Sequence, residues 1–408
     1  MLKYFSSRYA DSLMCIVFFF LNINYAMEND RRKLLIFHPA LAPYRVDQFN
    51  LLSRLFDLHV VFLFEDVPYD SFDQNKLIYR LTCSYSYLLR GPSFKGRIFR
   101  FGILKTIRKI CPDIIIGYEF SPITLYLNFL KSIGLYRGIL GTTNDDSLQI
   151  CEDLKSGLRK CSRDYLCRKL DFIVVLSDSV SDFYKNRYGL HDFQLIVNPI
   201  LQDEESILSC LGLKIEIAKS YIDRYNLLGK KVILYVGRLV KEKGLLLFIR
   251  TIADCLKNRE DFSLVVVGAG PMKVEIAEFV DQESLNNIHL VGRVEGHDLI
   301  GWYLASSGFV LPSVYEPFGA VVNEALLCGL PVLCSTFVGS ATLLNDRNGI
   351  IFDPTDAKNV RRVFEEFGHK INSVEYDGIV KKSLMDYDMV TINSEWSKLT
   401  LLKGECLS

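Results

Sequence analysis

The amino-acid sequence predicts an α/β protein made of two tandem Rossmann-like domains that face each other across a cleft. Short apolar runs recur along the chain with helical stretches between them, which indicates parallel sheets with helices on both faces. A polar, charged interval from Gln202 to Lys230 interrupts this alternation once, so the chain divides into two blocks. With 408 residues, 49% of them hydrophobic, the chain is long enough for two buried cores.

Six apolar runs predict the strands of the first block: 33–38, 58–64, 113–117, 138–142, 171–176 and 193–197. Residues 39–52 begin as a loop and become a helix. The segment from Glu65 to Arg100 is aromatic and basic without a clear period. We expect it to be either a surface for an amphiphilic acceptor or membrane, or ordinary core with covering helices.

Six further runs predict the second block: 232–237, 264–268, 288–292, 309–311, 332–334 and 350–352. Parallel sheets bind ligands at the carboxyl ends of their strands, so we expect the ligand cleft between those ends. The predicted divisions are an extension at 1–32, a first domain at 33–200, a connector at 201–229, a second domain at 230–370 and a helical tail at 371–408.

Lys3 and Arg8 precede an apolar run at residues 13–23, as in a secretory signal. The run is too short to span a membrane, which takes about 20 residues. Alternatively, translation starts at Met27, and we favour a non-structural extension. The 11 cysteines are scattered without C-x-x-C pairs, which indicates reduced, mostly buried thiols. The 48 basic and 48 acidic residues balance, so no bulk charge indicates a nucleic-acid partner.

The most informative stretch is 313–331, which follows a predicted strand and contains Glu316 and Glu324 with seven residues between them. Pro317 is expected at the first helical position, and Gly329 with a following proline at the helix end. The N-terminal amides of such a helix favour an anion, and Gly319 has no side chain to keep one away. The alternative is a surface helix with two solvated glutamates.

A second group of residues follows the first strand of the second block. Arg238 and Lys243 lie five residues apart in a loop, where two cations would neutralise a diphosphate without a metal ion. The alternative is a basic turn whose lysines are solvated. Gly237 and Gly268 end successive strands, which indicates that another group approaches the main chain closely at these positions. Arg293 follows the third strand and either serves a nucleobase or is simply exposed.

Five motifs in order resemble the family 4 retaining glycosyltransferases of GT-B fold: G-R-L-V-K-E-K-G, V-V-G-A-G-P, H-L-V-G-R-V, the stretch L-P-S-V-Y-E-P-F-G-A-V-V-N-E-A-L-L-C-G-L-P-V, and N-G-I-I-F-D-P. The resemblance implies Arg238, Lys243 and Glu316 as catalytic residues, with the two cations on the donor diphosphate. It implies a donor site in which Glu324 binds the ribose and in which Glu316 and the amides of residues 318–321 hold the sugar and phosphate. The donor-binding residues are then Gly237, Gly268, Arg293, Phe318, Gly319, Ala320, Val321 and Glu324.

The first block resembles the family less closely. Tyr44 and Arg45 lie in the loop that faces the acceptor in some members, although many carry a Gly-Gly pair that is absent here. Glu119 stands where an acidic residue or histidine is often found. Asn144 stands where many members have a histidine. These four residues are the acceptor-side expectations.

The resemblance implies a retaining hexosyltransferase that moves a sugar from a UDP- or GDP-sugar to a hydroxyl of a glycan or lipid-linked acceptor, in cell-surface polysaccharide synthesis. It implies no cofactor, no metal site and independence of metal ions. The expected location is the cytoplasm, peripherally on the inner face of the cytoplasmic membrane. Two alternatives stay open: a sugar-nucleotide epimerase of the same fold, and a non-catalytic sugar-nucleotide-binding subunit. A phosphorylase of this architecture would need a cofactor lysine, and no motif indicates one.

Overall fold

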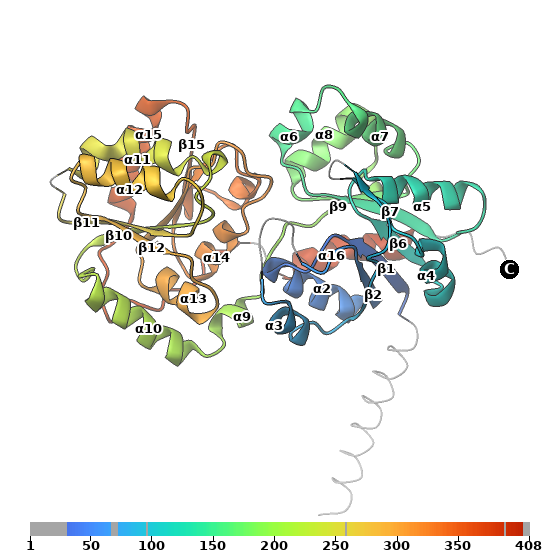
Figure 1. Ribbon diagram of the computed structural model, residues 1–408, viewed down its shortest axis with the longest axis horizontal. Helices are drawn as coiled ribbons and strands as arrows, with labels where there is room; N and C mark the ends of the chain where they lie inside the picture. The colour runs from blue at the N-terminus through green and yellow to red at the C-terminus, as the bar shows by residue number, and fades with distance from the viewer. Residues whose placement is uncertain (1–30, 67–71, 95–96, 258, 387–388, 403–408) are drawn as a thin grey trace, which may run out of the picture. The chain divides into compact units, whose positions relative to one another are not determined.

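The structure is a computed structural model that describes residues 31–66, 72–94, 97–257, 259–386 and 389–402 (Figure 1). Nearly all of the predicted N-terminal extension therefore lies outside the described residues. The described chain groups into two compact units that divide between Gly141 and Thr142. Two Rossmann-like parallel sheets confirm the predicted fold class. The predicted domain boundaries and the cleft stay predictions.

The first sheet has seven strands in the order β3-β2-β1-β6-β7-β8-β9. Lys33 lies opposite Asp57 in the parallel register of β1 and β2, and the apolar centres of these strands are buried. The strands are β1 (Lys33–His38), β2 (Asp57–Phe62), β3 (Ser84–Tyr87), β6 (Ile114–Gly117), β7 (Ile139–Asn144), β8 (Phe172–Val175) and β9 (Leu195–Val197).

Helices connect these strands and lead to the second sheet. They are α2 (Pro43–Leu55), α3 (Gln74–Tyr79), α4 (Ile103–Ile110), α5 (Pro122–Ser132), α6 (Leu148–Asp153), α7 (Leu158–Leu166), α8 (Asp178–Tyr188), the 3-10 turn η1 (Asp192–Gln194), α9 (Glu204–Leu208) and α10 (Leu211–Arg224). The predicted connector at 201–229 thus contains two helices, α9 and α10.

The segment from Glu65 to Arg100 contains β-strands that the sequence did not predict. It contains α3, the edge strand β3, and a two-stranded antiparallel sheet of β4 (Ser93–Phe94) and β5 (Arg97–Ile98). His59 of β2 fixes the edge strand, since its two ring nitrogens lie 2.9 Å from Ser84 Oγ and 2.8 Å from Ser86 Oγ. Four residues that alternate serine and tyrosine give too little apolar signal to predict a strand.

The second sheet is entirely parallel, in the order β12-β11-β10-β13-β14-β15. Its strands match the six predicted runs to within two residues at each end. They are β10 (Lys231–Val236), β11 (Phe262–Val267), β12 (Ile288–Gly292), β13 (Gly308–Leu311), β14 (Val332–Ser335) and β15 (Gly349–Phe352).

Helices cover both faces of this sheet. Figure 1 shows α11, α12 and α15 on one face, and α10 with α13 on the other. Along the chain after β10 the helices and 3-10 turns are η2 (Lys241–Lys243), α11 (Leu245–Leu256), α12 (Lys273–Gln282), α13 (His297–Leu304), α14 (Val321–Leu327), η3 (Gly339–Leu343) and α15 (Ala357–Lys370), and α16 (Met389–Leu401) then returns to the first sheet.

The prediction that a helix begins at Pro317 is wrong, because α14 begins only at Val321. Gly319 has a φ of +84°, which a right-handed helix cannot contain. Ser340 fixes the preceding loop: its N–H donates to Phe318 O at 2.7 Å and its Oγ donates to Gly319 O at 2.9 Å. Glu316 therefore lies in a loop, whereas Glu324 lies on the helix. The helix ends as predicted, since Gly329 follows it in the left-handed conformation.

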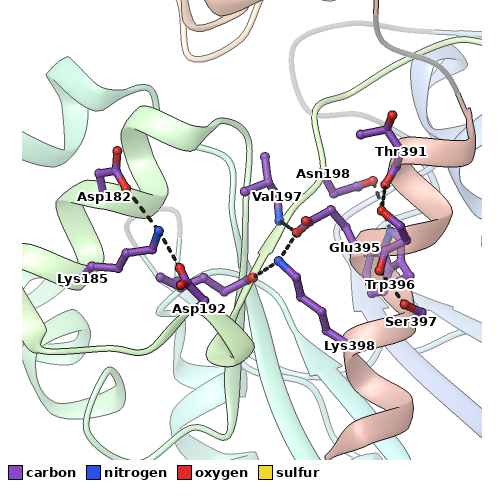
Figure 2. A network of polar contacts seen from close by, with 12 residues as sticks. Asp182, Lys185, Asp192, Val197, Asn198, Thr391, Glu395, Trp396, Ser397 and Lys398 are labelled. Carbon is purple, nitrogen blue, oxygen red and sulfur yellow. Dashed lines mark hydrogen bonds and ion pairs between the residues drawn. The ribbon is translucent and has the colours of Figure 1, made fainter.

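The predicted helical tail contains α16, which packs against the end of β9 (Figure 2). Glu395 accepts a 2.9 Å hydrogen bond from Val197 N–H and also pairs with Lys398 at 2.6 Å. Trp396 is buried and donates from Nε1 to Asn198 Oδ1 at 3.2 Å. The tail is thus an integral part of the fold around β9.

Candidate functional site

Two loops that carry predicted site residues meet at the carboxyl ends of β10 and β13. These strands are parallel neighbours, with Leu234 opposite Phe309, so both loops emerge at the same edge of the sheet. The main-chain N–H groups of Val314 and Tyr315 donate to Glu242 O at 2.9 and 3.2 Å, which joins the two loops.

Gly244 makes this junction close. Its φ is +63°, and a Cβ atom there would lie 2.3 Å from Pro312 O. Any residue with a side chain would push the loop after β10 away from the loop after β13.

Lys243 and Glu316 form an ion pair across this junction. The side chains are only 16% and 11% exposed, so the pair is largely shielded from water. Burial and the positive charge of Arg238 lower the pKa of Lys243 to about 8. The Glu316 carboxylate acts in the opposite direction, since an opposite charge favours the ammonium form. The site thus holds a lysine that loses its charge more easily than an ordinary lysine.

Arg238 lies near enough to this pair for its charge to lower the pKa of Lys243. Its side chain is exposed, while its main-chain O accepts a 3.0 Å hydrogen bond from the hydroxyl of the buried Tyr235. The alternative of a solvated basic turn fits Lys241 and Glu242, which are exposed, but not Lys243. Two cations of one loop therefore lie close together beside a carboxylate.

Glu324 is not a solvated glutamate on a surface helix. Its Oε2 accepts a 2.7 Å hydrogen bond from the Tyr303 hydroxyl, and its Oε1 accepts a 2.5 Å bond from Gln202 Nε2. The main-chain N–H of Gln202 also donates to Asn323 Oδ1 at 2.7 Å. Burial raises the pKa of Glu324 above its ordinary value.

Neither partner of Glu324 was predicted from the sequence. Gln202 lies more than a hundred residues away in the connector, and no motif marks it. Tyr303 is a helical aromatic of α13, where core packing is the ordinary interpretation. Its complete burial next to a carboxylate is visible only in three dimensions.

The loop between Glu316 and α14 contains main-chain N–H groups that donate no hydrogen bond within the described residues. Within the described ranges, the structure records no hydrogen bond from the N–H groups of Phe318, Gly319, Ala320 or Val321. The absence of a side chain at Gly319 has a structural cause, since a Cβ atom there would lie 2.9 Å from Leu311 Cδ2 and 3.1 Å from Val338 Cγ1.

The glycines at the ends of β10, β11 and β12 contact one another. A Cβ atom on Gly268 would lie 1.9 Å from Gly237 O, and the Gly268 N–H donates to Gly292 O at 2.8 Å. The close approach predicted for Gly237 and Gly268 is thus between the loops themselves. Arg293, which follows β12, is exposed and pairs with Glu295 at 2.6 Å.

Three of the predicted acceptor-side residues lie in the first unit. Tyr44 and Arg45 occupy the first turn of α2, and Arg45 is buried with its Nη1 2.5 Å from Gln48 Oε1. Burial and the Arg45 charge lower the pKa of His38 to about 3. Glu119 follows β6 with a φ of +45°, and its main-chain O accepts a 2.7 Å hydrogen bond from Thr124 Oγ1.

Asn144 belongs to the second unit and ends β7. Its side chain is fully buried, with Nδ2 3.5 Å from Cys151 Sγ. It therefore presents no side-chain surface to solvent in this structure.

Among the described residues, no cluster of metal-binding side chains lies at the Lys243–Glu316 junction, and two surface hollows lie elsewhere. No group of three or more His, Cys, Asp or Glu side chains in the described part of the chain is arranged to hold a metal ion. Two surface hollows of about 850 and 480 Å³ are lined by other residues. The nine cysteines among the described residues are free thiols, and four of them are buried, fewer than the sequence indicated.

Residues 220–373 match the family model described as Glycosyl transferases group 1. An uncharacterized glycosyltransferase of Methanocaldococcus jannaschii is 32% identical over 173 residues, which are 40% of this chain and 44% of that protein. The 2-deoxystreptamine N-acetyl-D-glucosaminyltransferase of Niallia circulans is 28% identical over 197 residues, 46% of this chain and 47% of that one. The chain thus spans about half the length of these relatives.

Solved structures share the fold over most of the chain. An Anabaena protein, HepE, solved in complex with UDP and glucose, superimposes with a TM-score of 0.66 at 17% identity, covering 91% of this chain and 100% of that one. A sucrose-phosphate synthase from Thermosynechococcus elongatus gives 0.60 at 17% identity, covering 91% and 97%. The described residues therefore have the two-sheet GT-B fold, and the matched family segment contains the junction of Lys243 with Glu316.

Proposed function

We propose that the protein is a retaining glycosyltransferase that moves a sugar from a UDP- or GDP-sugar to a hydroxyl of a glycan or lipid-linked acceptor. The observation that carries this proposal is the pair of Lys243 and Glu316, with Arg238 beside it, at the carboxyl ends of adjacent parallel strands. This edge is where ligands bind in α/β sheets. The family match over residues 220–373 and the names of the relatives support the same class of reaction.

In this reaction the bond between the anomeric carbon and the diphosphate oxygen breaks, and a bond to the acceptor oxygen forms on the same face. The acceptor proton passes to the departing phosphate. Arg238 and Lys243 stabilise the negative charge that develops on the diphosphate. Lys243 is held by Glu316 and largely shielded from water, whereas Arg238 is exposed. Glu316 positions the Lys243 ammonium and accepts hydrogen bonds from the sugar hydroxyls.

Glu324 binds the ribose of the donor. A carboxylate has about four lone-pair positions, of which Tyr303 and Gln202 occupy two. Two hydroxyls of a ribose can use the remaining positions. Tyr303 thereby acts as a positioning residue that fixes the carboxylate for the ribose.

For the acceptor we propose a glycan or lipid-linked sugar of cell-surface polysaccharide synthesis, with the protein in the cytoplasm on the inner face of the membrane. The described residues contain no helix with the length and apolarity needed to cross a membrane. Tyr44, Arg45, Glu119 and Asn144 remain the proposed acceptor-side residues.

A donor screen tests the proposal. We expect a UDP- or GDP-sugar to raise the melting temperature, and that donor to support transfer to an acceptor. Lys243→Ala should slow transfer by about 30- to 1000-fold, because one lost charge at the leaving group costs about 2–4 kcal/mol at the barrier. Lys241→Ala is the matched control, since Lys241 lies in the same turn and is exposed. Equal activity of the two variants would contradict the assigned role of Lys243.

Metal independence is a separate part of the proposal. If the two cations neutralise the diphosphate, transfer should continue after chelation of divalent ions with EDTA. Complete loss that added Mg²⁺ or Mn²⁺ restores would refute this part and leave the transfer reaction itself in place.

A further inference from the structure

The chain is neutral as a whole, but one stretch of the first unit is strongly basic. Residues 81–140 contain two acidic side chains, Asp113 and Glu119. The same stretch contains nine basic ones: Arg90, Lys95, Arg97, Arg100, Lys105, Arg108, Lys109, Lys131 and Arg137. Its formal net charge is therefore +7, and the remainder of the chain balances it with −7.

Large apolar side chains are exposed within the same stretch. Phe101 is 61% exposed, Phe129 53%, Ile133 51% and Leu135 44%. Aromatic contacts connect the first two: Phe101 packs against Phe99, Phe99 against Tyr126, and Tyr126 stacks on Phe129, with centroids 5.6–6.4 Å apart. Ile133 follows at the end of α5, where its N–H donates to Phe129 O at 3.1 Å.

Cations adjoin this apolar group. Arg90 is exposed, and its main-chain O accepts a 2.9 Å hydrogen bond from Phe101 N–H. Lys105 is exposed on the first turn of α4, four residues after Phe101. Arg137 is exposed two residues after Leu135. We name the apolar residues Phe101, Phe129, Ile133 and Leu135, with Arg90, Lys105 and Arg137, the basic aromatic face.

The two acidic residues of the stretch lie at opposite ends of β6. Asp113 accepts a 2.8 Å hydrogen bond from the main-chain N–H of Lys33 at the start of β1. Glu119 lies after the opposite, carboxyl end of β6.

We propose that the basic aromatic face docks on an anionic membrane surface. Aromatic rings favour the interface between lipid headgroups and acyl chains, and lysine and arginine near it are attracted to anionic lipids within a Debye length. The basic aromatic face combines exposed aromatic rings with cations. Because the whole chain has no net charge, attraction to an anionic membrane must come from such a local surface. This surface lies mostly after the Glu65–Arg100 segment that the sequence indicated.

This surface gives a physical basis for the inner-membrane location in the proposed function, and it involves none of the donor-site residues. A nucleic acid or an acidic surface of a second copy of this chain could also meet a basic face, and the test separates these from lipid. It uses the full chain without donor or acceptor, so its result is independent of the proposed transferase activity.

The test is flotation with vesicles of phosphatidylcholine alone or with phosphatidylglycerol added, at low and high salt. We expect binding to the anionic vesicles only, and weaker binding at high salt. The double variant Phe101→Asp with Phe129→Asp should bind at least about tenfold more weakly, since each removes one large apolar side chain from the interface. Lys105→Glu should weaken binding at least about fivefold.

Phe193→Asp is the matched control, because Phe193 is 51% exposed but lies outside the stretch. It should bind like the wild type, and all variants should keep the wild-type melting temperature. The proposal is overturned if the wild type does not float with anionic vesicles, or if the double variant and the control bind equally. Two further outcomes would overturn it. In both, vesicle binding by the double variant is unchanged, and either its oligomeric state in light scattering changes or its binding to RNA is lost.

Discussion

The lowered pKa of Lys243 predicts an unusual pH dependence of the proposed transfer. At a pKa of about 8, the ammonium form falls to about one tenth at pH 9, whereas a lysine with the ordinary value of 10.5 would remain almost fully charged. This lowered pKa means that the site stabilises the ammonium form, relative to the neutral amine, by about 3 kcal/mol less than water does. Because only the charged form stabilises the leaving diphosphate, kcat/KM should fall about tenfold for each pH unit above 8.

The sign of the stability effect keeps this prediction separate from unfolding. A lysine whose pKa is lower in the folded state than in the unfolded chain binds fewer protons when folded between about pH 8 and 10.5. The free energy of unfolding contributed by this group therefore rises with pH in that window. The expected loss of activity above pH 8 should occur without a loss of melting temperature caused by Lys243.

The assay is the pH profile of kcat/KM with saturating acceptor, since this parameter reports the free enzyme. Glu316→Gln should move the fall to lower pH, because the carboxylate that favours the charged lysine is lost. Lys243→Arg should remove the fall, whatever its activity at neutral pH, because a guanidinium stays charged. A wild-type profile that is flat to pH 10 would refute the assignment of Lys243 as a charged contact of the donor.

Three further predictions address the surrounding structure. Tyr303→Phe removes one of the two hydrogen bonds to the Glu324 carboxylate. Because hydrogen bonds to charged groups are worth about 1.5–3 kcal/mol, nucleotide affinity measured by calorimetry should fall about tenfold or more. Unchanged affinity would contradict the positioning role of Tyr303. Gly268→Ala should lower the free energy of unfolding more than Gly229→Ala in urea titrations, because both glycines have positive φ but only Gly268 lacks room for a Cβ atom; equal losses would count against the loop contact. Trp396→Ala should destabilise by about 3–5 kcal/mol in the same titrations, and a loss below 1 kcal/mol would show that α16 is not part of the core.

Two features of the sequence made parts of the fold and site predictable. Apolar runs mark buried strands, and the carboxyl ends of parallel strands lie at one edge of the sheet. Apolar runs located all six strands of the second sheet, since buried parallel strands are continuous in hydrophobicity. The meeting of Lys243 with Glu316 was predictable in the same way, because both follow strands whose carboxyl ends share one edge. The strand β3 was not, because alternating serines and tyrosines give little apolar signal. Its serines contact His59 of β2, and its tyrosines contact the ring of Phe62.

The start of α14 shows where a local rule gave the wrong answer. Proline favours the first helical position, yet Pro317 precedes a glycine whose φ of +84° excludes a helix at Gly319. The sequence contains the glycine but not its conformation, which depends on contacts with Leu311, Val338 and Ser340. As a result, Glu316 is fixed in a loop held by β13 and η3, and Glu324 on a helix.

The two glutamates therefore have different supports, and this has a functional consequence. Glu316 is paired with a cation whose charge changes near pH 8, while Glu324 is held by the neutral groups of Tyr303 and Gln202. Affinity for the nucleotide part of the donor should then vary little between pH 7 and 9, whereas the rate of transfer should fall. A nucleoside monophosphate, which lacks the sugar and the second phosphate, is the probe that separates the two. If its affinity fell as steeply with pH as the rate, the division of roles between Glu316 and Glu324 would be wrong.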